Sequence, residues 1–277
     1  MRMETEFRFW NYKTPDGNSA PDPEPARIYG PVYYVGPLTV CAYLIETSEG
    51  LLLVDTGSEK DFRPIAFNIR KLGFRPEEIR WILNTHWHED HTGGNASFSE
   101  LSGAAVMIHE GDAEVLETGL FNNRFVTPRC SVARKLKDGD ELRFGDITVS
   151  VIHSPGQSPG SAVFLADLKG SHGTCKALFA GDATGFKSNP ELYALYGYPG
   201  AADHYRKSIS ILKSLEFDLY LGGHPHQVAV EMGDHGNPFI SREDWMGLLD
   251  ARHSRMEEFI GRKETSSQSQ SVQTMST

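Results

Sequence analysis

The 277-residue chain is poor in cysteine, in long apolar runs and in positive charge, and each shortage excludes a class of protein. Its three cysteines are far apart in the sequence, so we expect free, buried thiols and no disulfide framework. No segment approaches the roughly 18 apolar residues of a membrane-spanning helix. The net charge of −10 disfavours nucleic acid and anionic membranes as partners, because both require a concentrated basic surface.

The N-terminal sequence also lacks the apolar core of a signal peptide. The sequence as it stands therefore predicts a cytoplasmic protein. A periplasmic or secreted protein whose signal had already been removed would have the same sequence.

Composition divides the chain into three segments. Residues 1–26 are polar and rich in proline, which predicts an extended N-terminal arm. Residues 264–277 are polar and of low complexity, which predicts a disordered tail. Residues 27–263 contain no evident repeat and no linker, so we expect them to form one domain.

Within that domain, apolar runs alternate with segments of helical spacing, which predicts sheets covered by helices. Helical patterns occupy residues 61–72, 205–216 and 241–262, and Gly145-Asp146 is typical of the turn of a β-hairpin. Short apolar runs end in the sequences LLLVDTG, RWILNTH, FAGD and LGGHP. Polar residues with metal-binding side chains come directly after these runs, where loops commonly build sites.

A dense cluster of histidines and carboxylates follows the run RWILNTH. The sequence HWHEDH places three histidines and two carboxylates within residues 86–91. Imidazole nitrogens and carboxylate oxygens are ordinary zinc ligands. His86 and His88 alternate along the chain and can project to one side of an extended backbone, whereas Asp90 and His91 follow where the chain can turn into a helix. The pattern predicts a zinc site.

These residues match the signature His-x-His-x-Asp-His, and on them the chain resembles the metallo-β-lactamase superfamily. The resemblance implies the α/β class, as a four-layered αβ/βα sandwich with the site at its edge. It also implies that Asp55 of LLLVDTG supports the metal centre from behind, that Asp182 of FAGD bridges two metal ions, and that His224 of LGGHP is a ligand.

By the same resemblance, the chain binds one or two Zn²⁺ ions in two adjoining ligand sets. The first ion would be held by His86 and His88, and the second by Asp90, His91 and His224.

Position 157 departs from the family. Members usually complete the first ligand set with the histidine of a Gly-His-Thr/Ser-Pro-Gly turn, but this chain has Gln157 in that place. An amide oxygen can bind zinc, although it is a poorer donor than imidazole. Three outcomes are open: Gln157 is a weak ligand, a water replaces it, or the first site is empty. His153, four residues earlier, is expected to be structural or to lie behind the ligands.

The segments NTHWHEDHTGG and HYRKSISILKSLEFDLYLGGHP, with the long loop between FAGD and the latter, are most similar to the third metallo-β-lactamase subclass. This implies a small-molecule substrate and opening of β-lactam rings by a zinc-bound hydroxide. Asp90 and Asp182 would be the catalytic carboxylates, with Asp90 accepting a hydrogen bond from the nucleophile and helping to protonate the leaving group. Thr184, Tyr198 and His226 are the candidates for substrate binding.

An Asp at position 182 is equally typical of lactonases and glyoxalase-type thioesterases. The alternative is therefore an acyl-homoserine lactonase, or another ester or thioester hydrolase, with aromatic residues of the segment 186–198 lining an acyl pocket. The polar tail after Arg262 is too short for the basic helical domain that the glyoxalase type normally carries. A third hypothesis is an inactive metal-binding scaffold that lost its activity when Gln157 replaced the ligand histidine. The intact residues at the other metal positions argue against this hypothesis.

Overall fold

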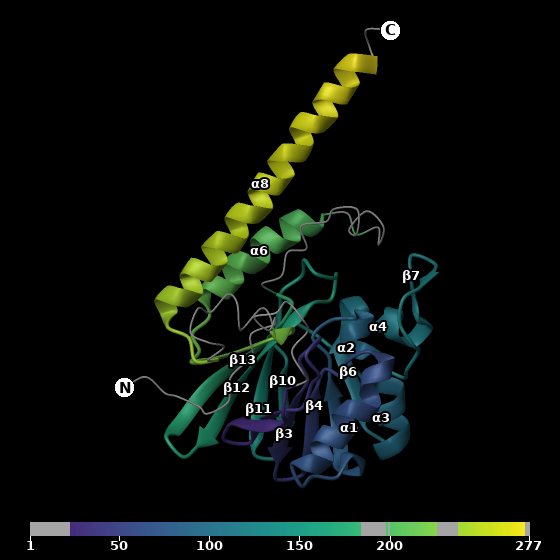
Figure 1. The fold of residues 1–277 in the computed structure, drawn as a ribbon, viewed down its shortest axis with the longest axis vertical. Coiled ribbons are helices and arrows are strands. Elements are labelled where there is room, and N and C mark those ends of the chain that lie inside the picture. The colour runs from purple at the N-terminus through teal and green to yellow at the C-terminus, as the bar shows by residue number, and fades with distance from the viewer. Residues whose placement is uncertain (1–22, 184–197, 199, 226–237, 275–277) are drawn as a thin grey trace, which may run out of the picture.

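The computed structural model describes residues 23–183, 198, 200–225 and 238–274, with side chains described as far as residue 258. The helices and strands form two sheets that face each other, with helices on the outer side of each (Figure 1). This is the four-layered αβ/βα sandwich that the resemblance implied.

The first sheet has seven strands in the order β1-β2-β3-β4-β5-β6-β9. Its central strand β4 is buried from Leu51 to Val54, because the sheet is covered on both faces. The strands are β1 (Ala26–Tyr29), β2 (Val32–Tyr34), β3 (Tyr43–Thr47), β4 (Gly50–Val54), β5 (Ile79–Leu83), β6 (Ala105–His109) and β9 (Arg134–Leu136).

The second sheet has five strands in the order β10-β11-β12-β13-β14. Its first hairpin turns at Gly145-Asp146, as predicted, since Phe144 pairs with Ile147. The strands are β10 (Glu141–Phe144), β11 (Ile147–His153), β12 (Ala162–Gly170), β13 (Gly173–Gly181) and β14 (Leu219–Gly222), and a separate small hairpin consists of β7 (Leu120–Phe121) and β8 (Arg124–Phe125).

Helices cover both outer faces, and three of them lie at the predicted positions 61–72, 205–216 and 241–262 with shifted ends. The α-helices are α1 (Phe62–Lys71), α2 (Glu89–Thr92), α3 (Asn95–Ser102), α4 (Glu110–Thr118), α6 (Ala201–Ser214) and α8 (Arg242–Thr274), with short 3₁₀ turns at η1 (Glu59–Asp61) and η2 (Pro76–Glu78).

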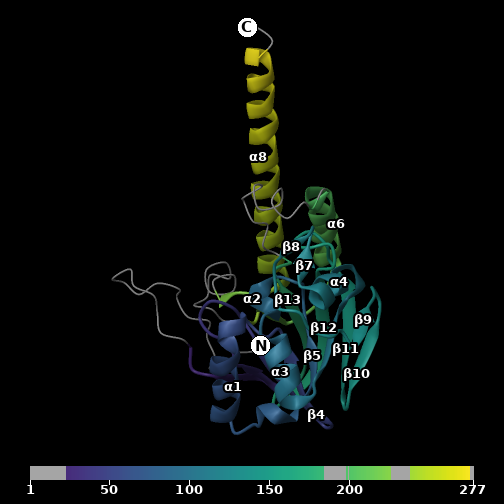
Figure 2. The ribbon, with the colours of Figure 1, turned by 90° about the vertical axis from the view of Figure 1, so that its right-hand side faces the viewer.

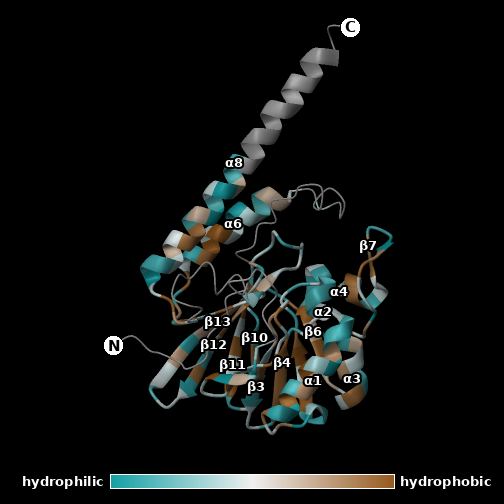
Figure 3. Ribbon diagram, viewed as in Figure 1, coloured by the Kyte–Doolittle hydropathy of each residue, from teal (hydrophilic) through white to brown (hydrophobic). Residues whose placement is uncertain are grey.

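Two apolar clusters hold the layers together. One joins the first sheet to α1, α3 and α4 through side chains such as Ile65, Phe98 and Leu116. The other fills the space between the sheets, where the Tyr43 and Phe179 rings lie 5.7 Å apart, and extends to α6 and α8. The strands are correspondingly apolar, whereas the covering helices carry polar residues on their outer sides (Figure 3).

Helix α8 departs from the predicted boundary. It continues to Thr274 instead of ending at Arg262, and its C-terminal part extends away from the sheets in both views (Figures 1 and 2). The sequence pattern located only the part that has apolar residues to pack, since the remainder contains few. The division into arm, domain and tail stays a prediction.

The cysteines form no disulfide, as expected: Cys41, Cys130 and Cys175 are all free thiols. The prediction of complete burial was wrong for Cys130, which lies on the half-buried segment after α4 and β8. Among the helices of the described segments, none combines the length and the apolar character needed to cross a bilayer.

Candidate metal centre

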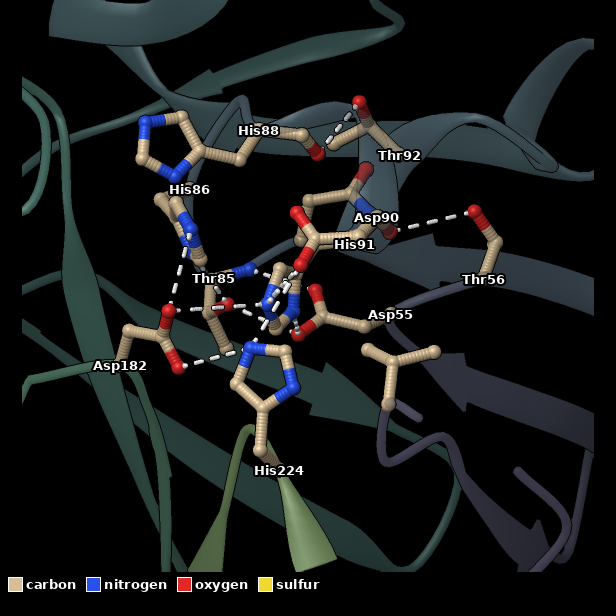
Figure 4. A network of polar contacts seen from close by, with 12 residues as sticks. Asp55, Thr56, Thr85, His86, His88, Asp90, His91, Thr92, Asp182 and His224 are labelled. Carbon is tan, nitrogen blue, oxygen red and sulfur yellow. Dashed lines mark hydrogen bonds and ion pairs between the residues drawn. The ribbon is translucent and has the colours of Figure 1, made fainter. Parts of the chain in front are cut away.

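The candidate centre lies where four strands end. Strands β4 and β5 are parallel, and so are β13 and β14, so their carboxyl ends meet at one edge of the sandwich. Asp55, His86, Asp182 and His224 follow these strands within a few residues and converge there (Figure 4). The two sheets are tied together at this edge by Ala162, whose N–H donates to the carbonyl of Thr85 at 2.9 Å.

One group of three side chains is arranged to hold a metal ion. The ligand atoms of Asp90, His91 and His224 all lie within 4.8 Å of one another. His224 Nε2 is 3.5 Å from Asp90 Oδ2 and 3.4 Å from Asp182 Oδ1, so a second carboxylate faces the same space. Two imidazoles with two carboxylates form a donor set that suits zinc and similar divalent ions.

Contacts behind the imidazoles leave their Nε2 atoms facing the centre. The carboxylate of Asp55 accepts a hydrogen bond from His91 Nδ1 at 2.8 Å, and the carbonyl of Thr39 accepts one from His224 Nδ1 at 2.7 Å. Such partners fix the tautomer of a ligand histidine and raise its basicity. His91 Nε2 is buried and has no hydrogen-bond partner within the described part of the chain, which fits a metal ligand.

Asp55 also acts on His86. The hydroxyl of Thr85 donates to Asp55 Oδ2 at 2.8 Å, so the Thr85 oxygen can accept a hydrogen bond from His86 Nδ1, 3.1 Å away. His86 Nε2 then faces Asp182 Oδ2 at 4.0 Å. A single carboxylate therefore orients two imidazoles, one directly and one through a hydroxyl. Asp55 itself has a positive φ of 56°, in the left-handed region that is uncommon for residues other than glycine, asparagine and aspartate.

A second group of potential ligands overlaps the first. His86, His91 and Asp182 also bring one ligand atom each within 4.8 Å of the others. Both groups use His91, whose Nδ1 is engaged by Asp55, so this residue offers one lone pair to one metal ion. The two groups are therefore alternatives for any ion that binds His91.

Mutual attraction keeps the carboxylates of the centre ionised. Burial alone would raise the pKa of Asp182, but the charges of His224, His91 and His86 outweigh it and hold the pKa well below its usual value. The pKa of Asp90 is lowered too, because His91 and His224 outweigh the effect of burial. For His91 burial works against the charged form, yet Asp90 and Asp55 raise the pKa to about 9. The centre is built to hold positive charge.

His88 and Gln157, predicted for the first ligand set, contact each other. His88 is in neither group of ligand atoms, and its Nδ1 lies 3.3 Å from Gln157 Nε2. The Gln157 side chain is buried and reaches Asp182 Oδ2 at 3.0 Å. The amide therefore lies between two of the expected ligands of a first metal ion.

The other predicted residues lie around the centre or outside the described part of the chain. His153 Nε2 is 2.9 Å from the carbonyl of Pro159, so His153 supports the turn that carries Gln157. The hydroxyl of Tyr198 is 2.6 Å from Nδ1 of His204, on α6. Thr184 and His226 lie outside the described residues.

Sequence reasoning missed Asp112, which joins the two loops of the centre. This fully buried carboxylate accepts hydrogen bonds from the N–H of Trp87, between the two first histidines, and from Ser158 and Gly160, beside Gln157. Burial raises its pKa to about 7. The signal was available: Asp112 shares the buried face of α4 with Leu116, four residues later, where an apolar residue is the norm.

The family model of the metallo-β-lactamase superfamily matches residues 35–224, which include the whole centre. The chain belongs to the metallo-β-lactamase superfamily. Among solved structures, its neighbours include a subclass B3 metallo-β-lactamase of Bradyrhizobium japonicum, 31% identical, with a TM-score of 0.78 over 89% of this chain and 97% of that one. A class B3 di-zinc metallo-β-lactamase from an Alaskan soil metagenome is also 31% identical, with a TM-score of 0.76 over 89% of this chain and 99% of that one.

Curated relatives of other activities in the superfamily match shorter stretches. An N-acyl homoserine lactonase of Bacillus cereus is 28% identical over 159 residues, which cover 48% of this chain and 60% of the lactonase. A hydroxyacylglutathione hydrolase of Hyphomonas neptunium is 31% identical over 111 residues, which cover 39% of this chain and 36% of the hydrolase. The chain thus spans less than two thirds of the length of either relative.

Proposed function

We propose that the chain is a zinc-dependent hydrolase that opens β-lactam rings, in the manner of subclass B3 enzymes. The observation that carries this proposal is the convergence of Asp90, His91 and His224 within 4.8 Å, with Asp182 beside them. Support comes from the subclass B3 neighbours, which align over nearly their whole length, whereas the lactonase match covers 60% of that enzyme.

When bound by these residues, zinc lowers the pKa of a water ligand towards 7 and polarises a carbonyl group. The chain supplies the proton transfer. Asp90 is the most exposed of these carboxylates, with 37% of its side chain accessible, so it lies where substrate can reach it. Its lowered pKa leaves it ionised at neutral pH and able to accept the proton of the attacking water. Returning that proton to the amide nitrogen would complete the cleavage of the C–N bond.

His224 and Asp182 fix the position of this centre relative to substrate. Both follow strands of the second sheet, and the hydroxyl of Tyr43 on the first sheet donates to the carbonyl of Gly222 at 2.7 Å. This bond holds the end of β14 against the first sheet, which carries Asp90 and His91. Hydrolysis requires both halves, so the rigid junction is expected to hold reacting groups within a fraction of an ångström.

The test compares two substrates on one zinc-loaded preparation: a chromogenic cephalosporin and an N-acyl homoserine lactone. We expect cephalosporin turnover and a fall in kcat/KM of about 100-fold or more in Asp90→Asn, which is the usual contribution of a general acid–base group. Asp167→Asn, an exposed carboxylate on β12, is the matched control and should retain activity. Undiminished turnover in Asp90→Asn would refute the assignment of the proton carrier.

The second candidate is a lactonase, favoured by the similarity to N-acyl homoserine lactonases of several Bacillus strains. The same residues would then act on an ester carbonyl, with the proton going to a departing oxygen. Lactone turnover without cephalosporin turnover would replace the first proposal by this one. Absence of both, in a protein that binds zinc, would leave the inactive scaffold.

A further inference from the structure

Gln157 contacts the centre through its amide nitrogen. Nε2 lies 3.0 Å from Asp182 Oδ2 and 3.3 Å from His88 Nδ1, and the side chain is 5% exposed. A carboxylate can only accept, so the atom that faces Asp182 must be the NH₂ group and not the carbonyl oxygen. The assignment of the amide therefore follows from its partner.

An NH₂ group has two hydrogens, and the structure provides two acceptors. Asp182 takes one, and the lone pair of His88 Nδ1 can take the other. This arrangement makes His88 a neutral imidazole that carries its proton on Nε2. A metal ion on this edge of the ring would need His88 Nδ1 as its ligand. That nitrogen is then already hydrogen-bonded to Gln157.

The NH₂ group of Gln157 lies among the residues that were expected to hold the first metal ion. The two acceptors of Gln157 are expected ligands of a first metal ion, and the His86 ring lies 4.6 Å from the His88 ring, centroid to centroid. The donor of the amide points into this set, whereas Gln157 Oε1, its only potential ligand atom, has no hydrogen-bond partner within the described residues.

We propose that the carboxamide of Gln157 takes the place of the first metal ion, so that each chain binds one metal ion, held by Asp90, His91 and His224 with Asp182. The proposal rests on the metal centre of the proposed function and deepens it by fixing its stoichiometry. Gln157 is then a positioning residue that holds Asp182 and His88, not a ligand. Histidine at this position would instead present a lone pair to the same space.

The experiment measures metal per chain, independently of any activity. The metal-free protein is titrated with Co²⁺ while its visible absorption is followed, and zinc content is determined by mass spectrometry after dialysis. We expect saturation at one equivalent in the natural chain and a second equivalent in Gln157→His. The variant His88→Ala should still bind one equivalent, because His88 is not a ligand in this arrangement.

Two equivalents in the natural chain that fall to one in His88→Ala would overturn the proposal, since His88 and the amide would then belong to a working first site. Circular dichroism checks that each variant is folded. A second readout is the ¹⁵N spectrum of the His88 ring, which should keep its proton on Nε2 when zinc is added. One metal ion per chain without β-lactam turnover would refute the proposed function but not this inference. Two metal ions per chain with β-lactam turnover would refute this inference but not the proposed function.

Discussion

The buried carboxylate of Asp112 accepts a hydrogen bond of 2.5 Å from the hydroxyl of Ser158, and through it α4 holds the turn that carries Gln157. The same carboxylate accepts from the N–H of Trp87 at 3.0 Å, inside the histidine motif. The two loops that build one side of the metal centre thus depend on one side chain that contacts neither metal-binding group.

Replacing Asp112 by alanine should therefore loosen both loops at once. The buried N–H groups of Trp87 and Gly160 would lose their acceptor, which we expect to lower the free energy of unfolding by about 2–4 kcal/mol. Urea denaturation of the metal-free protein measures the loss. Ser158→Ala removes one bond and leaves both N–H groups satisfied, so it should cost clearly less. Equal losses in the two variants would contradict a bridging role for Asp112.

His109 should make the protein less stable in mild acid. Its ring stacks on that of His153 at 4.0 Å, and its Nδ1 accepts a hydrogen bond from Gly111. Burial, together with the charge of His153, lowers the pKa of His109 to about 4 from its usual 6.5. Between these values the unfolded chain binds more protons than the folded one. The contribution of His109 to the free energy of unfolding is therefore fully present above about pH 6.5. It is lost as the pH drops towards 4, by at most about 1.4 kcal/mol per pH unit.

The substitution His109→Asn tests this slope, because asparagine can still cap α4 without binding a proton. The difference in unfolding free energy between variant and natural chain should shift in favour of the variant as the pH falls from 6.5 to 4.

Asp112→Asn should show the opposite pH dependence. Burial raises the pKa of Asp112 to about 7 from 3.8, so its contribution to stability is fully present below about pH 4 and is lost as the pH rises to 7. Parallel slopes in the two variants would contradict both assignments.

These contacts show which parts of the centre the sequence could reveal. The residues of HWHEDH are adjacent in the chain, and Asp182 and His224 follow apolar strands, so their convergence was predictable from the pattern and the family resemblance. The position of Gln157 against Asp182 was not. Its direction depends on a turn held by Asp112, and a contact between distant loops leaves no periodic signal.

The same limit applies to the fold. Helix α1 was predicted because its apolar residues recur at helical spacing, and strand β4 because it is a short continuous apolar run. Helix α3 was missed, since its sequence NASFSELS buries only Asn95 and Phe98 and its stability comes from tertiary contacts. In this chain, the apolar pattern of the sequence reveals the elements that bury several side chains. Elements that bury few side chains, such as α3, are not detected by it.

Gly223 should strengthen metal binding although it offers no ligand. A methyl group on its Cα would lie 2.7 Å from Asp182 Oδ1 and 2.9 Å from His91 Cε1, closer than atoms can pack. Gly223→Ala should displace one of these side chains, destabilise the protein by about 1–3 kcal/mol and weaken metal binding about tenfold or more. Competition with a chromophoric chelator measures the affinity.

The control is Gly247→Ala on α8, where the added methyl group meets no atom within 4 Å. It should stabilise the protein by up to about 1 kcal/mol, as alanine does in a helix, and leave metal affinity unchanged. If both variants bound metal as the natural chain does, the tight contact at Gly223 would have no role in the centre.

Asp55 should set the affinity of the centre through the two imidazoles that it orients. Asp55→Asn preserves the backbone, because asparagine accepts the positive φ of 56° at this position. Only one oxygen remains, so the amide cannot accept from both the N–H of Thr85 and the Nδ1 of His91. The loss of this support is expected to weaken metal binding about 10- to 100-fold, as measured by chelator competition.

Asp61→Asn, which removes a buried carboxylate bound to the N–H of Ser58, is the matched control and should leave the affinity within about threefold. Equal losses in the two variants would mean that buried charge in this region, and not the orientation of the histidines, determines affinity.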